Sequence, residues 1–109
     1  MSPRRAFAPV AVLLAALLLT GCGAVGRVTS GDPSQGKQLF TDKCGSCHTL
    51  ADAKSTGTVG PNLDAAHPSA ALVAERVRDG KGVMPSFAGK LSDTEIAAVA
   101  AYVSGAASG

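Results

Sequence analysis

The sequence is poor in aromatic side chains. It has no tryptophan, one tyrosine and three phenylalanines among its 109 residues. The stretch of mixed, foldable composition runs only from about residue 32 to residue 104, which allows a single small domain. A domain of this size rarely buries enough apolar surface by itself and usually needs disulfides, a metal or a large cofactor. We therefore expect a bound group to fill part of the interior.

The sequence also has little net charge. Its ten basic and eight acidic side chains give a formal charge of +2, and two of the basic ones are Arg4 and Arg5. Without these two residues, eight basic side chains remain against eight acidic ones, a balance of zero. This balance excludes the basic footprint of a nucleic-acid-binding protein.

Strand-like alternation is missing as well. No segment alternates apolar and polar residues with the period of two that a half-buried strand requires. Apolar residues recur instead at helical spacing, in segments separated by long loops. We expect an all-α domain of about three to five helices wrapped around one bound group.

Three segments have the capping residues or apolar spacing of helices. The first begins at Asp32 and Pro33, a preferred N-cap followed by proline at the first helical position, and is expected to end near residue 43. The second covers residues 68–79, with its apolar residues on one side. The third begins at Ser92, which can form a capping box with Glu95.

The longest uncharged apolar stretch lies at the N-terminus. Arg4 and Arg5 precede residues 6–19, which have the composition of the core of a secretion signal. The sequence Leu-Thr-Gly-Cys at residues 19–22 then resembles the lipobox of bacterial lipoproteins. The resemblance implies cleavage before Cys22 and lipidation of that cysteine, and two attached acyl chains would give lasting membrane attachment.

An uncleaved signal anchor is the alternative, because residues 6–26 carry no charge and a span needs about 20 residues. The lipoprotein interpretation gives the following organisation: residues 1–21 form a signal peptide, 22–31 a lipidated cysteine and flexible tether, 32–104 the folded domain and 105–109 a small-residue tail.

Residues 44–48 read Cys-Gly-Ser-Cys-His. If the first helix continues into this turn, both thiols lie on one side of it and reach the vinyl groups along one edge of a haem. His48, next to the second thiol, is then held against the iron. C-x-x-C-H is the attachment motif of haem c, and Cys44 and Cys47 are the candidate attachment residues.

A zinc site and a redox disulfide are the alternatives for this motif. Zinc requires four ligands, and beyond Cys44, Cys47 and His48 the mature chain offers only His67, with no second ligand pair beside it. A thioredoxin-like disulfide would follow a strand in a βαβ unit, and no such unit is visible. Haem attachment is the interpretation we favour.

With this motif, the chain resembles a small bacterial class I cytochrome c over the whole foldable segment. Gly36 and Phe40 are similar to the glycine and aromatic residue of that family where the first helix crosses the last. The aromatic residue of the last helix would here be Tyr102. A glycine at such a crossing allows two helix backbones to approach closely.

The resemblance also implies roles for Pro61 and Met84. The Gly-Pro-Asn-Leu sequence at residues 60–63 is similar to the loop whose proline carbonyl accepts a hydrogen bond from the ligand histidine. Met84 is the only methionine outside the signal segment, and it lies in a Met-Pro stretch where the family places its axial ligand. His67 is the competing ligand.

These features together predict a membrane-anchored c-type cytochrome with one covalently attached haem c. Methionine ligation raises the potential, and two axial ligands leave no open position for a substrate. We expect a monomeric one-electron carrier between respiratory or other redox proteins, without catalytic residues, nucleic acid or small-molecule substrate, on the outer face of the bacterial cytoplasmic membrane. A haem subunit of a larger oxidase or dehydrogenase, a gas-binding haem sensor and a thiol oxidoreductase are the alternatives.

Overall fold

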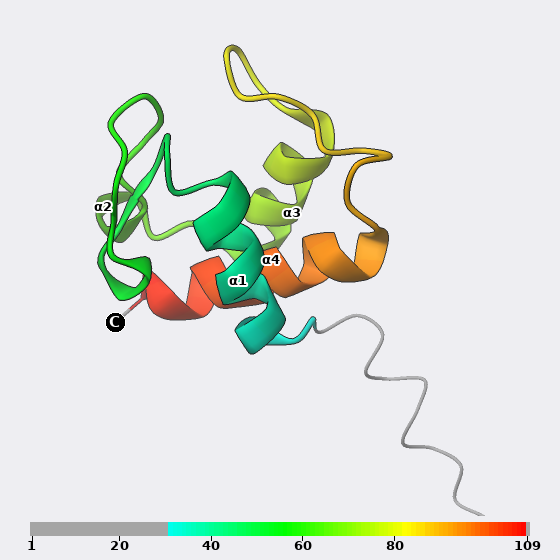
Figure 1. The fold of residues 1–109 in the computed structure, drawn as a ribbon, viewed down its shortest axis with the longest axis horizontal. Coiled ribbons are helices and arrows are strands. Elements are labelled where there is room, and N and C mark those ends of the chain that lie inside the picture. Colours follow the sequence, from blue (N-terminus) through cyan, green and yellow to red (C-terminus); the bar gives the residue numbers. More distant parts are fainter. Residues whose placement is uncertain (1–30, 109) are drawn as a thin grey trace, which may run out of the picture.

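The computed structural model describes residues 31–108. This part of the chain forms four α-helices, a short 3-10 turn and one small hairpin (Figure 1). In chain order the elements are α1 (Pro33–Lys43), β1 (Thr49–Leu50), η2 (Ala51–Ala53), β2 (Ser55–Thr56), α2 (Leu63–Ala66), α3 (Ala70–Asp79) and α4 (Asp93–Ala106). The predicted small helical fold is confirmed, with one difference. The two antiparallel two-residue strands, in which Thr49 pairs with Thr56, were not expected.

Side chains cap the N-terminal ends of the helices. The Asp32 carboxylate accepts a hydrogen bond from the Ser34 backbone N–H at 2.9 Å, as a helix N-cap does. Ser92 and Glu95 form the predicted capping box, in which each side chain accepts from the backbone N–H of the other residue. Helix α3 begins at Ala70, slightly later than expected, because Ser69 is its N-cap.

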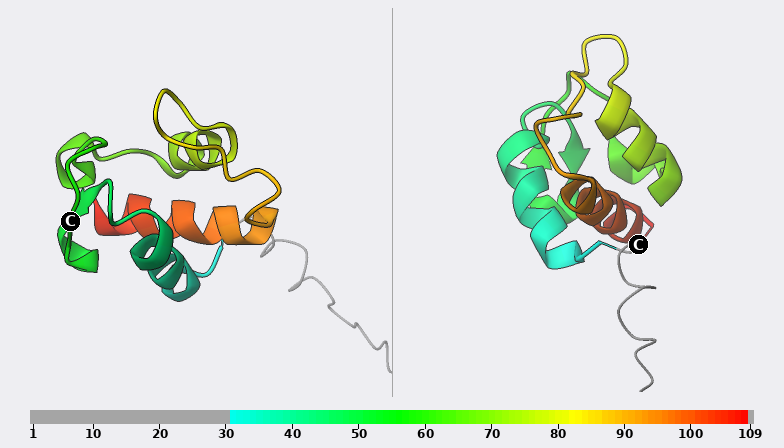
Figure 2. Two further views of the ribbon diagram at one scale, coloured as in Figure 1. Left: turned by 45° about the horizontal axis from the view of Figure 1, so that its top comes forward. Right: turned by 90° about the vertical axis from the view of Figure 1, so that its right-hand side faces the viewer.

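Helix α4 is the centre of the fold. Figure 2 shows α1 and α3 packed on two sides of α4 in the view along that helix. Helix α1 crosses α4 at Gly36, where an added Cβ would lie 2.0 Å from the Ala98 carbonyl oxygen. The rings of Phe40 and Tyr102 pack beside this crossing with their centroids 5.9 Å apart. The glycine and the two aromatic residues therefore meet as the sequence predicted.

The hydrophobic core lies where the three longer helices meet. Its buried members are Phe40, Leu50, Val73, Val77, Leu91, Ile96, Val99, Ala100, Tyr102, Val103 and Ala107. Helix α4 contributes more of them than any other element, so both neighbouring helices depend on it for burial. No polar or charged side chain of residues 31–108 is fully buried.

The folded domain extends beyond the expected boundaries at both ends. Helix α4 continues to Ala106, and Ala107 is only 2% exposed, so the expected tail packs into the core as far as that residue. The Nδ1 atom of His67 also contacts the carbonyl oxygen of Ala107. At the other end, a Cβ on Gly31 would lie 2.0 Å from the Ala98 backbone nitrogen, so Gly31 packs against α4.

The expected signal peptide, Cys22 and residues 23–30 of the tether lie outside the described residues. Within residues 31–108, no helix has the length and apolar character needed to cross a membrane.

Candidate functional site

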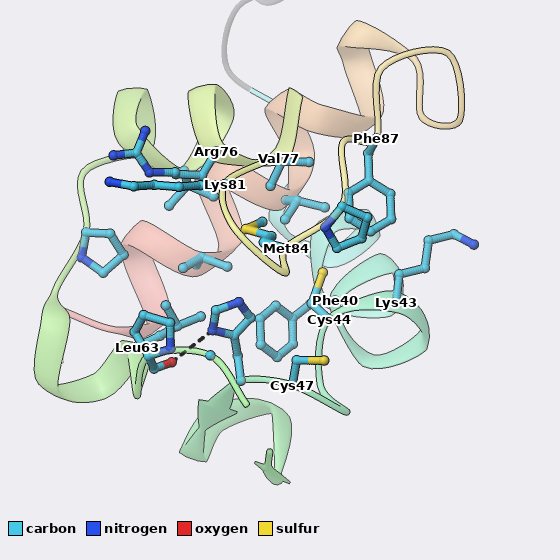
Figure 3. Close-up of a pocket in the computed structure, with 18 of the residues that line it drawn as sticks. Phe40, Lys43, Cys44, Cys47, Leu63, Arg76, Val77, Lys81, Met84 and Phe87 are labelled. Carbon is cyan, nitrogen blue, oxygen red and sulfur yellow. Dashed lines mark hydrogen bonds between the residues drawn. The ribbon is translucent and has the colours of Figure 1, made fainter. Parts of the chain in front are cut away.

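A cavity of about 660 Å³ lies between α1, α3, α4 and the loops that follow the first and third helices (Figure 3). Its volume falls within the roughly 300–1,000 Å³ typical of ligand sites. Apolar side chains form most of its wall, among them Phe40, Leu63, Val73, Val77, Phe87, Val99 and Val103. The core residues of the three longer helices therefore serve also as the floor of a binding site.

Cys44 and Cys47 line the cavity from the end of α1. The backbone N–H groups of Cys47 and His48 both donate to the Cys44 carbonyl oxygen at 3.1 Å, which makes residues 44–48 a single tight turn. Both cysteines are free thiols. Burial, with a smaller contribution from Cys47, raises the pKa of the Cys44 thiol to about 11, so this thiol is protonated at neutral pH.

His48 is held by the loop that precedes α2. Its Nδ1 atom lies 2.8 Å from the carbonyl oxygen of Pro61, and the dashed line in Figure 3 marks this bond. Because a carbonyl can only accept, Nδ1 carries the proton and Nε2 keeps its lone pair. Gly60 packs against the ring, since an added Cβ would lie 2.5 Å from His48 Cε1. The imidazole is therefore fixed both in tautomer and in position.

Met84 lines the cavity from the loop after α3. The backbones of Lys81 and Met84 exchange two hydrogen bonds, of 3.1 and 3.0 Å, across a turn in which Gly82 has a φ of 59°. This positive φ is easily adopted by glycine. Further along, the Phe87 N–H donates to the Val77 carbonyl at 2.8 Å and ties the loop to α3. Figure 3 shows Met84 pointing into the cavity from this loop.

His67, the competing ligand, does not line the cavity. It ends α2 in a left-handed conformation with a φ of 45°, and its Nδ1 atom faces the Ala107 carbonyl at the end of α4. The sequence named His67 only as the competing ligand and did not predict this contact, because it joins residues 40 positions apart.

The cavity suits a haem in both shape and chemistry. It offers two thiols, an imidazole whose Nε2 has no hydrogen-bonding partner among residues 31–108, and a thioether, within otherwise apolar walls. Thiols attach haem c covalently, and imidazole and thioether are its common axial ligands. In the same part of the chain, no group of three or more histidine, cysteine or carboxylate side chains lies close enough to hold a metal ion.

The sequence did not assign the three cationic residues of this site. Lys43, Arg76 and Lys81 line the cavity, and no aspartate or glutamate does so. The signal for Arg76 was present in the helical period, because it follows Leu72 by four residues and so lies on the same face of α3.

The sequence is similar to a known family along most of its length. Residues 31–103 match the family model described as cytochrome c oxidase, cbb3-type, subunit III. A cytochrome c6 of Tetradesmus obliquus is 40% identical over 93 residues, which cover 73% of this chain and 97% of the relative. A cytochrome c6 of Diacronema lutheri is 36% identical over 78 residues, which cover 67% of this chain and 94% of the relative.

The fold is similar to solved structures as well. The c-type cytochrome SorU from Sinorhizobium meliloti is 46% identical with a TM-score of 0.65, covering 68% of this chain and 88% of that one. Cytochrome c6 from the diatom Phaeodactylum tricornutum is 35% identical with a TM-score of 0.60, covering 72% of this chain and 97% of that one. Sequence and fold thus point to the same set of relatives.

Proposed function

The chain belongs to the small monohaem class I cytochrome c family, and on this basis we propose that it is a membrane-anchored carrier of single electrons between redox proteins on the outer face of the bacterial cytoplasmic membrane. Members of this family carry one covalently bound haem c. The chain is accordingly an electron carrier and not an enzyme.

Four residues would hold the haem. Cys44 and Cys47 would attach it through thioether bonds, and His48 Nε2 and the Met84 sulfur would be the axial ligands. The support is that all four side chains line one cavity although they come from two separate segments of the chain. When bound, the haem supplies reversible one-electron exchange at its iron.

The carrier function rests on one observation above all, namely that an imidazole and a thioether line the same mostly apolar cavity. If His48 and Met84 both bound the iron, no position would remain for a substrate or for oxygen. Methionine as a ligand also favours ferrous iron and raises the potential. These properties suit an electron carrier rather than a gas sensor or an oxygen-activating haem protein.

Pro61 would set the strength of the histidine ligand. The 2.8 Å bond from His48 Nδ1 to its carbonyl fixes the tautomer that leaves Nε2 free for the iron. Donation of this proton into a carbonyl also increases the electron density on the ring. Pro61 is suited to this task because the proline ring restricts the loop backbone.

Redox partners would contact the mouth of the cavity. Three of its lining residues are the large apolar side chains that remain exposed in residues 31–108: Val83 at 83%, Val59 at 66% and Leu72 at 40%. An apolar rim of this kind favours brief contact with another protein. Partners docked there would lie next to the haem edge.

The membrane anchor rests on sequence alone. Cys22 follows the lipobox-like residues 19–21, and at most nine residues separate it from Asp32. Nine residues span at most about 30 Å, so a lipidated Cys22 would keep the domain close to the membrane surface.

A fixed haem subunit of a larger complex is the second candidate, because the matching family model is described as an oxidase subunit. The curated relatives favour a free carrier, since the chain spans 94% and 97% of two cytochromes c6. Membranes solubilised in mild detergent separate the two proposals. A free carrier migrates at the size of the single chain, whereas a fixed subunit comigrates with its complex.

A redox titration of the purified holoprotein tests the carrier function. We expect a single reversible transition that follows a one-electron Nernst curve, with no loss of haem over repeated cycles. A transition that is irreversible, or that requires an added ligand, would contradict the proposal.

A further inference from the structure

Arg76 occupies a surprising position on α3. It follows Leu72 by four residues, lies beside Val77 and lines the apolar cavity with both of them. Its carboxylate partner among the described residues is Glu75 at 3.3 Å, whose side chain is 60% exposed. Neighbouring side chains on a helix do not face each other, and an exposed pair contributes little to stability. Glu75 therefore does not explain why a guanidinium lies on the cavity side of the helix.

Lys81 is a second cation that lines the same cavity. The paired backbones of Lys81 and Met84 fix the start of the loop that carries it. In Figure 3 the side chains of Arg76 and Lys81 both lie at the end of the cavity away from Cys44 and Cys47. No acidic residue lines the cavity, so these two charges have no counterion within it.

A haem supplies the missing anions. Its two vinyl groups and its two propionate carboxylates lie on opposite halves of the porphyrin. If Cys44 and Cys47 hold the vinyl half, the carboxylates extend toward the other end of the cavity. The remaining lining cation, Lys43, lies on the cysteine side in Figure 3 and is therefore poorly placed to meet them.

We propose that Arg76 and Lys81 form a binding site for the two haem propionates. This inference rests on the proposed thioether attachment at Cys44 and Cys47. Arg76 presents a planar fork of donors that matches a carboxylate, and Lys81 adds a point charge from the more exposed loop. The two residues are positioning residues for the haem rather than ligands of its iron.

The site has a consequence for the potential. A paired propionate contributes little net field at the iron, whereas an unpaired one leaves a negative charge near it. Loss of either cation therefore favours the ferric state and lowers the midpoint potential. Charge and hydrogen bonding around a haem are known means of setting its potential.

The test compares charge-matched variants of the holoprotein. Arg76→Gln and Lys81→Gln remove the proposed partners, while Arg78→Gln and Lys90→Gln remove the same charge from residues outside the cavity lining. Midpoint potentials are measured by redox titration at low ionic strength. We expect Arg76→Gln and Lys81→Gln to lower the potential by several times the shift of their controls, and Arg76→Lys to restore part of the loss. Equal shifts for Arg76→Gln and Arg78→Gln would overturn the proposal.

A second measurement uses the wild type, in case a variant accumulates without haem. In the nuclear Overhauser spectrum of the reduced, diamagnetic holoprotein, we expect cross-peaks between the propionate methylene protons and the side chains of Arg76 and Lys81. Their absence at both residues overturns the proposal.

The two proposals fail in different ways. Release of haem from the denatured wild type would contradict the proposed covalent attachment through Cys44 and Cys47. If the denatured wild type retains its haem but Arg76→Gln leaves the midpoint potential unchanged, only the propionate site is contradicted.

Discussion

A Cβ atom on Gly36 would lie 2.0 Å from the carbonyl oxygen of Ala98, so α1 and α4 cross with their backbones in contact. Phe40, one helical turn after Gly36, is buried by the same crossing and lines the cavity. Cys44 follows one turn later. The angle and depth of the crossing therefore set where the first proposed attachment residue lies relative to the cavity floor.

Gly36→Ala should destabilise the protein, because the added methyl group forces the two helices apart. Overpacking of this kind costs about 1–3 kcal/mol in free energy of unfolding. The matched control is Gly105→Ala on α4, where an added Cβ meets nothing within 4 Å. This control should be neutral or stabilising by about 0.5–1 kcal/mol. Denaturant unfolding of both variants measures the difference, and equal stabilities would contradict the described crossing.

Gly60→Ala should disturb His48 without removing any proposed ligand. The new methyl group would lie 2.5 Å from His48 Cε1 and would push the ring from its bond with Pro61. We expect a lower potential and an altered ferric absorption spectrum relative to the wild type. Gly105→Ala again serves as the control, and a Gly60→Ala spectrum identical to the wild type would rule out this close packing.

Tyr102→Phe should reduce stability in a pH-dependent way. The Tyr102 hydroxyl donates to Asp52 Oδ2 at 2.6 Å and is the main cause of a lowered Asp52 pKa, with Lys37 contributing less. A carboxyl group whose pKa is lower when folded stabilises the fold above its unfolded value of about 3.9, and this contribution disappears as the pH falls. The wild type should therefore exceed Tyr102→Phe in stability at neutral pH, by a margin that shrinks below about pH 4.

The control for Tyr102→Phe is the same change in an Asp52→Asn background. Unfolding is measured between acidic and neutral pH in both backgrounds. A margin that stays constant with pH in the Asp52 background would show that the hydroxyl acts through some group other than this carboxylate.

Local signals explain how much of the fold could be predicted from the sequence. Asp32 and the Ser92–Glu95 pair define helix starts through contacts within three residues, so their residue types alone were sufficient. The five residues of the attachment motif are contiguous, so this motif could also be recognised from the local sequence. The prediction that both thiols, His48 and Met84 gather at one place agrees with the cavity they line, while their roles as haem ligands stay predictions.

The missed features depend on contacts between distant residues. The hairpin of Thr49 and Thr56 is too short to show a period, and it exists only through its cross-strand pairing. The small residues after Ser104 resemble a tail until Ala107 is seen packed in the core and in contact with His67. Arg76 shares a face of α3 with Leu72 in the helical period, but only the fold shows that this face lines a cavity.

Cys22→Ser should abolish lipid labelling and processing at that site, because only a cysteine thiol can accept the diacylglyceryl group. Cells that express the chain are labelled with a radioactive fatty acid, and the N-terminus of the product is sequenced. Wild-type protein should carry label and begin at Cys22. A wild-type product that begins at Met1 without label would favour an uncleaved signal anchor.

The central claim is that His48 and Met84 close both axial positions of a haem in an electron carrier. Absorption spectra of the reduced, purified wild type with and without carbon monoxide at neutral pH test it most directly. The two wild-type spectra should be the same, whereas Met84→Ala, with its vacated position, should bind carbon monoxide readily. Stoichiometric binding of carbon monoxide by the wild type would contradict Met84 as a firm ligand and would favour a gas sensor over an electron carrier.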